Sequence, residues 1–593
     1  MNMKNLAQNR IKQRLESEIG ARYNHGASFR MALVYPNRYF FGMSNLGFQT
    51  LYRIANDLPD TSCERMFLPE EDILFQMPDG SLSTYEFKHH AQQLNLIAFS
   101  VSYQNDYLNL IPLLRLMGLN EIASLRKDSD PLIIAGGPAV TINPEPIAEI
   151  VDVAVIGEGE EVLQEIIDVL RRVSSKKEQL EALSKIAGVY VPTIFDNNYD
   201  KLKEGKKATQ GFGLVSGKAN GQAYLHASIR RRVVNPSNPL LAQSEVLTHD
   251  TEFGDMFLLE VQRGCQWGCR FCAAGYMYRF PRYDAFENLK KRIQNALKHR
   301  DKIGLIAGDL LGLDGIHDIL DYIDSLGGSF SPSSVRLNAF TPQIIAHLKK
   351  SGNRSIAIAP EAGSERLRRA LNKTFTQEEI IESAVKLAEG GIETIKLYIM
   401  IGLPTENEDD IEELCELTLA TRQALTQYAK RSAKMPTLAL SISPFVPKPS
   451  TPLQYEAFAG IPYLKKTTQQ IRKKILQAGH IRMSGESALD AYIETLLSRG
   501  PRQSLEFLQK ATIASGKSWA IANPGQLKKV FQSLELNAAT FTTQSFDPNS
   551  STPWDFIDHG IKANFFKREK NKFSEGKISH FCMPEVCRVC GVC

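Results

Sequence analysis

Short apolar runs alternate with amphipathic stretches over the first part of the chain. The runs occupy residues 31–35, 94–101, 131–135 and 151–156, and a helical pattern covers residues 46–55. Short apolar strands that alternate with helices predict a parallel α/β sheet. The third run leads into Gly136 and Gly137, and open α/β sheets bind ligands at the carboxyl ends of their strands. We therefore predict that these two glycines contact a cofactor, with a simple tight turn as the alternative.

A second alternating region begins after residue 250. Its apolar runs cover residues 256–262, 302–308, 334–339, 354–360, 394–402 and 437–446. Helical patterns separate these runs, such as the apolar stripe of Phe286, Leu289, Ile293 and Leu297. Six β/α units in series suffice for a partial barrel, whose active site would lie at the carboxyl ends of the strands.

These patterns place the chain in the α/β class and divide it into five parts. We expect a polar lead-in at 1–30, a Rossmann-like parallel-sheet domain at 31–189, a connector at 190–250, a partial (β/α)6 barrel at 251–464 and a mainly helical region at 465–593.

Composition favours a soluble globular protein over a disordered or membrane protein. The 593 residues are 43% hydrophobic and 23% charged, which is typical of a soluble globular protein and not of a disordered one. The net charge of +4 is too small to indicate a nucleic-acid binder by itself. No apolar stretch has the length of a signal peptide or a membrane span, so we expect a cytoplasmic protein without a membrane partner.

Seven of the nine cysteines fall in two groups. Cys265, Cys269 and Cys272 follow the first run of the second region with the spacing C-x3-C-x2-C. Three thiolates can ligate one face of a cubane iron–sulfur cluster and leave one iron open, whereas a zinc site would require a fourth ligand nearby. The two isolated cysteines, Cys63 and Cys415, are expected to be buried apolar residues.

The second group ends the given sequence. Cys582, Cys587, Cys590 and Cys593 form a four-ligand set that suits either a second iron–sulfur cluster or a structural zinc ion, and the spacing does not separate the two. A basic run with interleaved phenylalanines precedes it and is compatible with RNA binding or with a solvated helix face; its members are Lys562, Lys567, Arg568, Lys570, Lys572, Lys577, Phe565, Phe566 and Phe573.

The first cysteine group, with the aromatic Phe271 before its last cysteine, resembles the radical SAM superfamily. The resemblance implies a [4Fe–4S] cluster, S-adenosylmethionine, a 5′-deoxyadenosyl radical and an electron donor such as flavodoxin or ferredoxin. It also implies cofactor contacts at the strand ends: Gly308 and Asp309 for the methionine amino group, Glu361 for the ribose and Gly402 for the adenine side, with Arg336 in the third strand facing the barrel interior.

The first domain resembles the cobalamin-binding class, through the segments LIAFSVSYQND, IIAGGPAVTINPEP and VIGEGEE. It departs from that class because the Asp-x-His-x-x-Gly signature is absent, and the histidines before residue 200 are His25, His89 and His90. Two interpretations stay open: a corrinoid bound without a protein imidazole, or a Rossmann-like platform that binds none.

Six motifs in order resemble one bacterial radical SAM family with a cobalamin-binding-like first domain. They are FGMSNLGFQTLY, AGGPAVTINPEP, RGCQWGCRFCAAGYMYR, APEAGSERLR, PWDFIDHGI and CRVCGVC. We therefore expect a radical SAM enzyme that carries out cobalamin-assisted methylation or a related radical modification. The alternatives are a cobalamin-independent enzyme that uses the second cysteine group, with RNA as one substrate class, and a non-enzymatic metal-binding scaffold. The sequence does not indicate the substrate.

Overall fold

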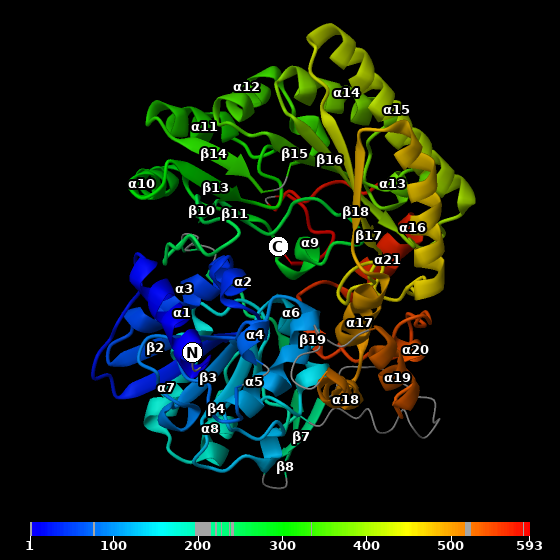
Figure 1. Cartoon of the computed structure of the whole chain (residues 1–593). Coiled ribbons are helices and arrows are strands. Elements are labelled where there is room, and N and C mark those ends of the chain that lie inside the picture. Colours follow the sequence, from blue (N-terminus) through cyan, green and yellow to red (C-terminus); the bar gives the residue numbers. More distant parts are fainter. Residues whose placement is uncertain are drawn as a thin grey trace. The chain divides into compact units, whose positions relative to one another are not determined.

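The structure is a computed structural model of the chain (Figure 1) and describes residues 3–74, 77–195, 215–219, 222–226, 228–235, 238, 242–333, 335–515, 524–584 and 586–592. The chain forms two compact units. Unit 1 comprises Met1–Gly254, Leu496–Phe541 and Asp547–Gly560, and unit 2 comprises Asp255–Thr495, Thr542–Phe546 and Ile561–Cys593. The segment 465–593 that we expected to form one helical region is therefore shared between the two units.

Unit 1 is built on a six-stranded sheet with the order β2-β1-β3-β4-β5-β6. Five strands are parallel and β6 is antiparallel. Their bounds are β1 Phe29–Tyr35, β2 Thr61–Phe67, β3 Leu96–Ser100, β4 Leu132–Gly136, β5 Val153–Val155 and β6 Val189–Tyr190. The expected helix is α3 (Leu46–Asp57), which begins where the Asn45 side chain accepts a hydrogen bond from the Phe48 amide.

The strand β2 was not predicted, because its sequence TSCERMF carries two charged residues. Both are buried and paired. The Arg65 guanidinium lies 2.7 Å from Glu18 and 2.6 Å from Glu86, and Glu64 lies 2.8 Å from the His89 ring. Partners from elsewhere in unit 1 thus allow charged residues in a strand that is buried along its whole length.

Residues from the later part of the chain complete unit 1. The strand β19 (Ile557–Asp558) pairs with β9 (Ile229–Arg230), and the buried Asn143 amide donates to the carbonyls of Ser498 (3.1 Å) and Gly500 (2.8 Å). The helices of this part are α18 (Leu505–Ser515), α19 (Pro524–Ser533) and α20 (Ala538–Phe541).

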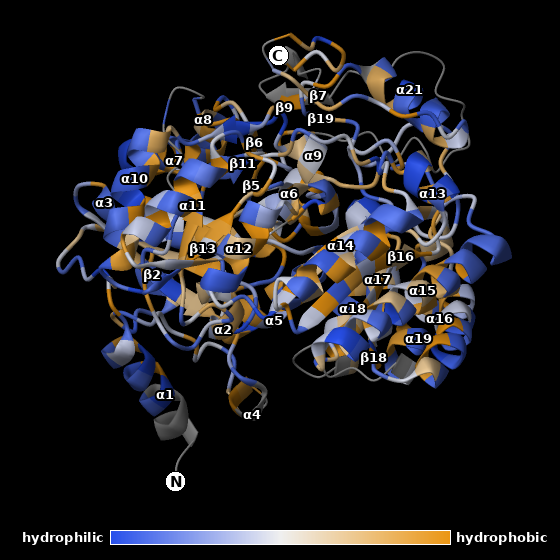
Figure 2. Ribbon diagram, turned by 90° about the horizontal axis from the view of Figure 1, so that it is seen from above, coloured by the Kyte–Doolittle hydropathy of each residue, from blue (hydrophilic) through white to orange (hydrophobic). Residues whose placement is uncertain are grey.

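Unit 2 contains two parallel sheets with helices between their strands. The first has the order β10-β13-β14 and the second the order β15-β16-β17-β18. The bounds are β10 Phe257–Glu260, β13 Lys302–Ile306, β14 Ser329–Pro332, β15 Ser355–Glu361, β16 Thr394–Ile401, β17 Thr437–Pro444 and β18 Ile481–Gly485. The strands β13 and β16 consist largely of hydrophobic residues, whereas the surrounding helices are partly hydrophilic (Figure 2). The α/β class and the partial barrel are confirmed.

The connecting helices of unit 2 are α10 Phe286–Leu297, α11 Ile316–Ser325, α12 Pro342–Lys350, α13 Glu365–Ala370, α14 Gln377–Glu389, α15 Glu408–Ser432 and α16 Ile461–Ile475. Four of these seven helices, α12 to α15, begin with a capping side chain that accepts a backbone hydrogen bond. The capping box of Thr376 and Glu379 is present at the start of α14.

The predicted strand at 334–339 is wrong. The third strand is β14, which pairs with β13 from Ser329 to Pro332, and residues Leu337–Ala339 form a single 3-10 turn. Parallel pairing with β13 outweighs the low strand propensity of Ser and Pro, and Pro332 is tolerated because β14 is an edge strand. The strand β18 was also missed, in a region that we expected to be helical.

Among the described residues, none of the helices has both the length and the apolar composition that a membrane crossing requires.

Candidate functional site

The three cysteines of the first group lie on one irregular loop of unit 2. The loop leaves β11 (Gln262–Arg263), contains the short helix α9 (Ala274–Met277) and returns as β12 (Arg282–Tyr283), which pairs with β11. Gly264 starts the loop with a φ of 81°, and a Cβ atom there would lie 2.3 Å from the Tyr278 carbonyl oxygen. Only glycine fits this close approach.

Burial and mutual proximity shape the chemistry of these thiols. Burial raises the pKa of Cys265 to about 12, and Cys269, Cys272 and Asp309 add to the effect. Burial and the Cys269 thiol also raise the pKa of Cys272. Such thiols ionise when a metal binds, because coordination favours the thiolate.

Within the described ranges, no group of three or more His, Cys, Asp or Glu side chains is arranged so that it could hold a single metal ion. Three soft thiolates on one loop instead fit an iron–sulfur cluster.

Gly308 and Asp309, which we predicted to contact a cofactor, follow β13 and contact the cysteine loop. A Cβ atom at Gly308 would lie 2.6 Å from the Gly264 carbonyl oxygen and 3.0 Å from the Cys265 Cβ. Asp309 is buried, and its Oδ2 accepts a hydrogen bond of 2.6 Å from the Trp267 indole N–H. Its Oδ1 is buried and has no hydrogen-bond partner among the described residues.

Arg336 reaches the same place from the turn after β14. Its guanidinium stacks 3.6 Å from the centre of the Trp267 ring and 4.9 Å from that of Phe375. Its Nε is buried and lacks a hydrogen-bond partner in the described part of the chain. The strand predicted for Arg336 is wrong, but the structure brings Arg336 and Asp309 to one indole ring, Arg336 over its face and Asp309 at its N–H. Sequence reasoning missed Trp267, although it is one of only three tryptophans and lies between two of the cysteines.

Glu361 is the last residue of β15 and has a φ of 71°. Its carboxylate lies 3.2 Å from the Lys373 ammonium, and burial raises its pKa. Burial lowers the pKa of Lys373, but Cys269 and Glu361 outweigh it and keep the amine charged. Lys373 therefore belongs to the site, and no periodicity or spacing in the sequence could have identified it.

Phe271 packs beside the turn that contains Gly402. Phe271 packs against an apolar cluster that includes Ala362, Leu371 and Leu403. Gly402 follows β16 with a φ of 77° and donates its N–H to Glu406 Oε1 at 2.7 Å.

Glu406 is a second residue that sequence reasoning missed. It also accepts a hydrogen bond of 2.8 Å from the Tyr463 hydroxyl. Burial raises its pKa to about 7. The predicted positions of unit 2 outside the second cysteine group thus follow the carboxyl ends of β10, β13, β14, β15 and β16.

The second cysteine group packs against the same loop. Cys582 and Cys590 are buried, Cys587 is partly exposed, and Cys593 lies outside the described residues. The segment around them runs beside the loop that carries α9 (Figure 1), and the Cys582 amide donates to the Gln266 carbonyl at 2.7 Å.

The remaining predicted positions lie in unit 1. Gly137 has a φ of 109°, and a Cβ atom there would lie 2.5 Å from the Val101 carbonyl oxygen. The backbone packing of β3 against the turn after β4 is therefore sufficient reason for this glycine. Cofactor binding at Gly136 and Gly137 stays a prediction.

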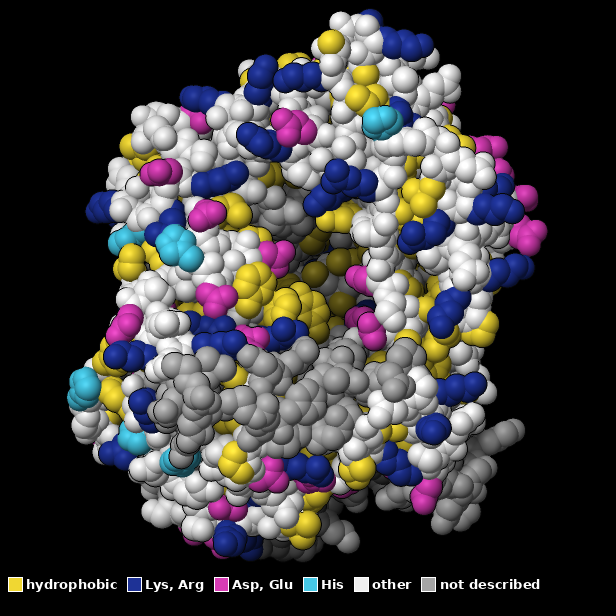
Figure 3. All heavy atoms as spheres, viewed as in Figure 1, with side chains coloured by type: hydrophobic (Ala, Val, Ile, Leu, Met, Phe, Trp, Pro, Cys, Tyr) yellow, Lys and Arg dark blue, Asp and Glu magenta, His cyan; other side chains and the backbone are white. Residues whose placement is uncertain are grey.

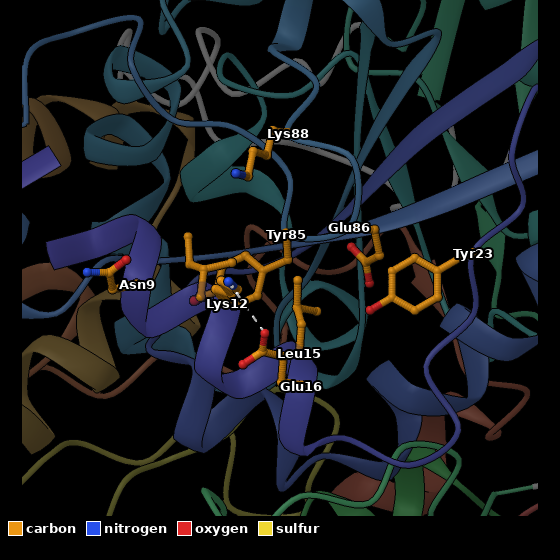
Figure 4. Close-up of a pocket in the computed structure, with 9 residues that line it drawn as sticks. Asn9, Lys12, Leu15, Glu16, Tyr23, Tyr85, Glu86 and Lys88 are labelled. Atoms are coloured by element: carbon orange, nitrogen blue, oxygen red, sulfur yellow. Dashed lines mark ion pairs between the residues drawn. The ribbon is translucent and has the colours of Figure 1, made fainter. Parts of the chain in front are cut away.

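Unit 1 also contains a pocket of about 340 Å³ between α1 (Met3–Ser17) and the segment 85–88 (Figure 4). Tyr23 and Glu86 lie next to each other in Figure 4, and Lys12 forms an exposed ion pair of 3.7 Å with Glu16. None of the predicted site residues lines it.

Comparisons with known proteins agree with this site. Residues 47–192 match the family described as radical SAM proteins, N-terminal, and residues 259–418 match the radical SAM superfamily. The chain is 27% identical over 481 residues to the uncharacterized protein MJ0966 of Methanocaldococcus jannaschii, covering 81% of this chain and 90% of that protein.

Two other matches are more distant. The ribosomal protein uS12 methylthiotransferase RimO of Thermotoga petrophila is 25% identical over 169 residues, which is 26% of this chain and 39% of RimO. The radical S-adenosylmethionine methyltransferase TsrM of Kitasatospora setae, solved with tryptophan and an S-adenosylmethionine analogue, superposes with a TM-score of 0.44 at 11% identity, covering 74% of this chain and 76% of TsrM.

Proposed function

The chain belongs to the radical SAM superfamily, and on this premise we propose that Cys265, Cys269 and Cys272 bind a [4Fe–4S] cluster at which S-adenosylmethionine is cleaved. The observation that carries the proposal is the loop itself. Its three thiols share one loop with Trp267, and Trp267 contacts both Asp309 and Arg336. When bound, the cluster supplies one electron that breaks a carbon–sulfur bond of S-adenosylmethionine and gives methionine and a 5′-deoxyadenosyl radical.

The residues around the loop fit the rest of the cofactor. Within the part of the chain that the structure describes, Asp309 Oδ1 and Arg336 Nε have no partner. The first suits an ammonium group and the second a carboxylate, so the two match the methionine end of S-adenosylmethionine. Trp267 contacts both groups and positions them. Glu361 would accept from ribose hydroxyls, and Phe271 with the Gly402 turn would line the adenine side.

We propose cobalamin-assisted methylation, or a related radical modification, as the overall reaction. Buried polar groups at the carboxyl edge of the unit 1 sheet support the proposal that a ligand binds there. Asn37 donates to Asp106 Oδ1 at 2.8 Å, while Asp106 Oδ2 and Asn109 Oδ1 are buried and lack partners among the described residues. Such acceptors suit the amide groups of a corrinoid, and no protein imidazole is required for them.

The alternative is a cobalamin-independent modification that uses a second metal centre at Cys582, Cys587, Cys590 and Cys593. RNA is the less favoured substrate in this case. Phe565 and Phe573 are buried, and Lys570 and Lys572 pair with Glu456 and Glu569, each at 2.9 Å. On the face in Figure 3, lysine and arginine are interspersed with aspartate and glutamate. A flavodoxin or ferredoxin is proposed as the electron donor in either case.

The test is anaerobic reconstitution with iron and sulfide, followed by S-adenosylmethionine and dithionite, with 5′-deoxyadenosine measured by mass spectrometry. We expect 5′-deoxyadenosine from the intact chain and none from Cys269→Ala. The matched control is Cys415→Ala, whose thiol is buried on α15 away from the loop. Absence of 5′-deoxyadenosine with the cluster loaded and cobalamin supplied would favour the scaffold alternative. Bound cobalamin would distinguish the first proposal from the cobalamin-independent one.

A further inference from the structure

The segment 577–592, called the tail below, is built into the loop of the first cysteine group. The Cys582 amide donates to the Gln266 carbonyl at 2.7 Å, and the Phe581 ring lies 5.4 Å from the Trp267 ring. Both loop residues lie between Cys265 and Cys269. The tail therefore contacts the part of the loop whose conformation sets the spacing of these two thiols.

Two further residues, Arg270 and Asn372, link the rest of the loop to the tail. The Arg270 guanidinium donates to the Lys577 carbonyl at 2.8 Å and to the Ser579 hydroxyl at 3.2 Å. The Ser579 amide donates to Asn372 at 2.7 Å, and Asn372 in turn donates to the Gly268 carbonyl at 3.2 Å. Every loop residue from Gln266 to Arg270 except Cys269 is thus linked to the tail by one of these contacts.

The loop also supplies a cation to the tail cysteines. Arg279 is buried, and its guanidinium lies over the rings of Tyr276 (5.5 Å) and Phe565 (5.4 Å). Cys582 accepts a hydrogen bond from this guanidinium, so the end of the loop is linked to the tail as well.

The tail is also held by hydrogen bonds from the Lys562 amide to the Cys590 carbonyl (2.8 Å) and from the Arg568 guanidinium to the Val589 carbonyl (3.1 Å). Its described residues contain no helix or strand. Val592 packs against an apolar cluster, but most other apolar side chains of the tail are exposed: Ile578 at 42%, Phe581 at 42%, Met583 at 43%, Val586 at 69% and Val589 at 51%. Burial of apolar surface therefore contributes little here, whereas a metal bound by cysteines supplies folding free energy directly.

We propose that a thiophilic metal centre on the tail cysteines orders the loop that binds the first cluster, so that loading of the tail site controls retention of that cluster. The proposal rests on the proposed function only in assigning the cluster to Cys265, Cys269 and Cys272. Under this proposal the dependence between the two metal sites runs in one direction only. The tail site forms without the first cluster, but the first cluster is not retained without the tail metal.

The decisive experiment uses the full chain with Cys265, Cys269 and Cys272 all changed to alanine, so that metal binds at the tail only. Elemental analysis identifies that metal as zinc or as iron with sulfide. Hydrogen exchange of residues 264–279 is then compared before and after removal of the metal with a chelator. We expect exchange to quicken at least about tenfold on removal, and unchanged exchange would overturn the proposal. S-adenosylmethionine cleavage plays no part in this readout, so its result is independent of the proposed function.

A second measurement keeps the proposal testable if the triple variant does not fold. In the otherwise intact chain, Cys587→Ser is compared with Val586→Ser after identical reconstitution. The control changes an exposed residue next to the ligand. We expect Cys587→Ser to lose most of the [4Fe–4S] electron paramagnetic resonance signal that responds to S-adenosylmethionine, and Val586→Ser to keep it. Full retention in Cys587→Ser would show that the loop does not depend on the tail metal.

Discussion

At the scale of single residues, Asp309 has one carboxylate oxygen bound by Trp267 and one without a partner among the described residues. We predict that Asp309→Asn weakens S-adenosylmethionine binding about 10- to 100-fold, because a charge-assisted hydrogen bond to the ammonium group is lost while the side chain keeps its shape. Anaerobic equilibrium dialysis of the cluster-loaded protein measures this.

Asp314→Asn is the matched control, since Asp314 is exposed on the same loop after β13. Its affinity should stay within about twofold of the unaltered chain. Equal weakening in both variants would mean that Asp309 acts only through the net charge of the site.

Glu406 gives the site a pH dependence. Burial raises its pKa from 4.5 to about 7, so the folded chain holds this proton where the unfolded chain has released it. Its contribution to stability therefore falls as the pH rises from 4.5 to about 7. We predict that Glu406→Gln, which keeps an acceptor for the Gly402 amide, gains stability relative to the unaltered chain over this range.

Melting temperatures of both proteins, measured from about pH 5 to about pH 8, test the sign. The difference between the variant and the unaltered chain should grow with pH up to about 7 and then level off. A difference that is constant over this range would show that Glu406 is ionised throughout.

Trp267, Lys373 and Glu406 also show what sequence patterns leave out at this scale. Cys265 was singled out by the cysteine spacing, and Asp309 and Gly402 by the resemblance of their strand-end segments to family motifs. Trp267 and Lys373 join the site through side-chain contacts made by loop residues, at 2.6 Å to Asp309 and 3.2 Å to Glu361. Such contacts leave no trace in hydrophobic periodicity.

At the scale of elements, α21 (Ala563–Ser574) is joined to the cysteine loop by a buried ion pair. Arg270 and Glu569, with side chains 0% and 4% exposed, lie 3.2 Å apart. We predict that Glu569→Gln destabilises unit 2 by about 3 kcal/mol, since a buried guanidinium loses its counter-charge but keeps the carbonyls of Ala370 and Lys577. Thermal unfolding measures the loss.

Glu575→Gln serves as the comparison, because Glu575 pairs with Lys577 at an exposed position just beyond the same helix. It should change stability by no more than about 0.5 kcal/mol. If both variants unfold alike, the Arg270 pair contributes nothing beyond a surface ion pair.

Elements were predictable where their own sequence decided them. The runs at 354–360 and 394–402 are β15 and β16, and the capping box gave the start of α14. Prediction failed where tertiary pairing outweighed local preference, as in β2 with its buried Glu64 and Arg65, and in β14 with its Pro332. Arg336 was therefore assigned to the wrong element although it reaches the site.

At the scale of the whole molecule, the boundary after residue 254 does not separate independent segments of chain. Unit 1 takes in Leu496–Phe541 and Asp547–Gly560. These segments supply the carbonyls bound by Asn143, the Phe556 ring that lies 4.8 Å from the Tyr190 ring, and the strand β19 that pairs with β9. A fragment that stops at residue 254 would leave these buried groups without partners.

We therefore predict that fragment 1–254 does not unfold cooperatively when expressed alone, because the unpaired polar groups and the uncovered apolar surface cost more than its sheet can offset. Co-expression with fragment 496–560 should restore a cooperative thermal transition, measured by circular dichroism. Fragment 465–495, which belongs to unit 2, is the control and should restore nothing. A cooperative transition from fragment 1–254 alone would mean that the sheet of unit 1 is stable without the later segments and that those segments only dock on it.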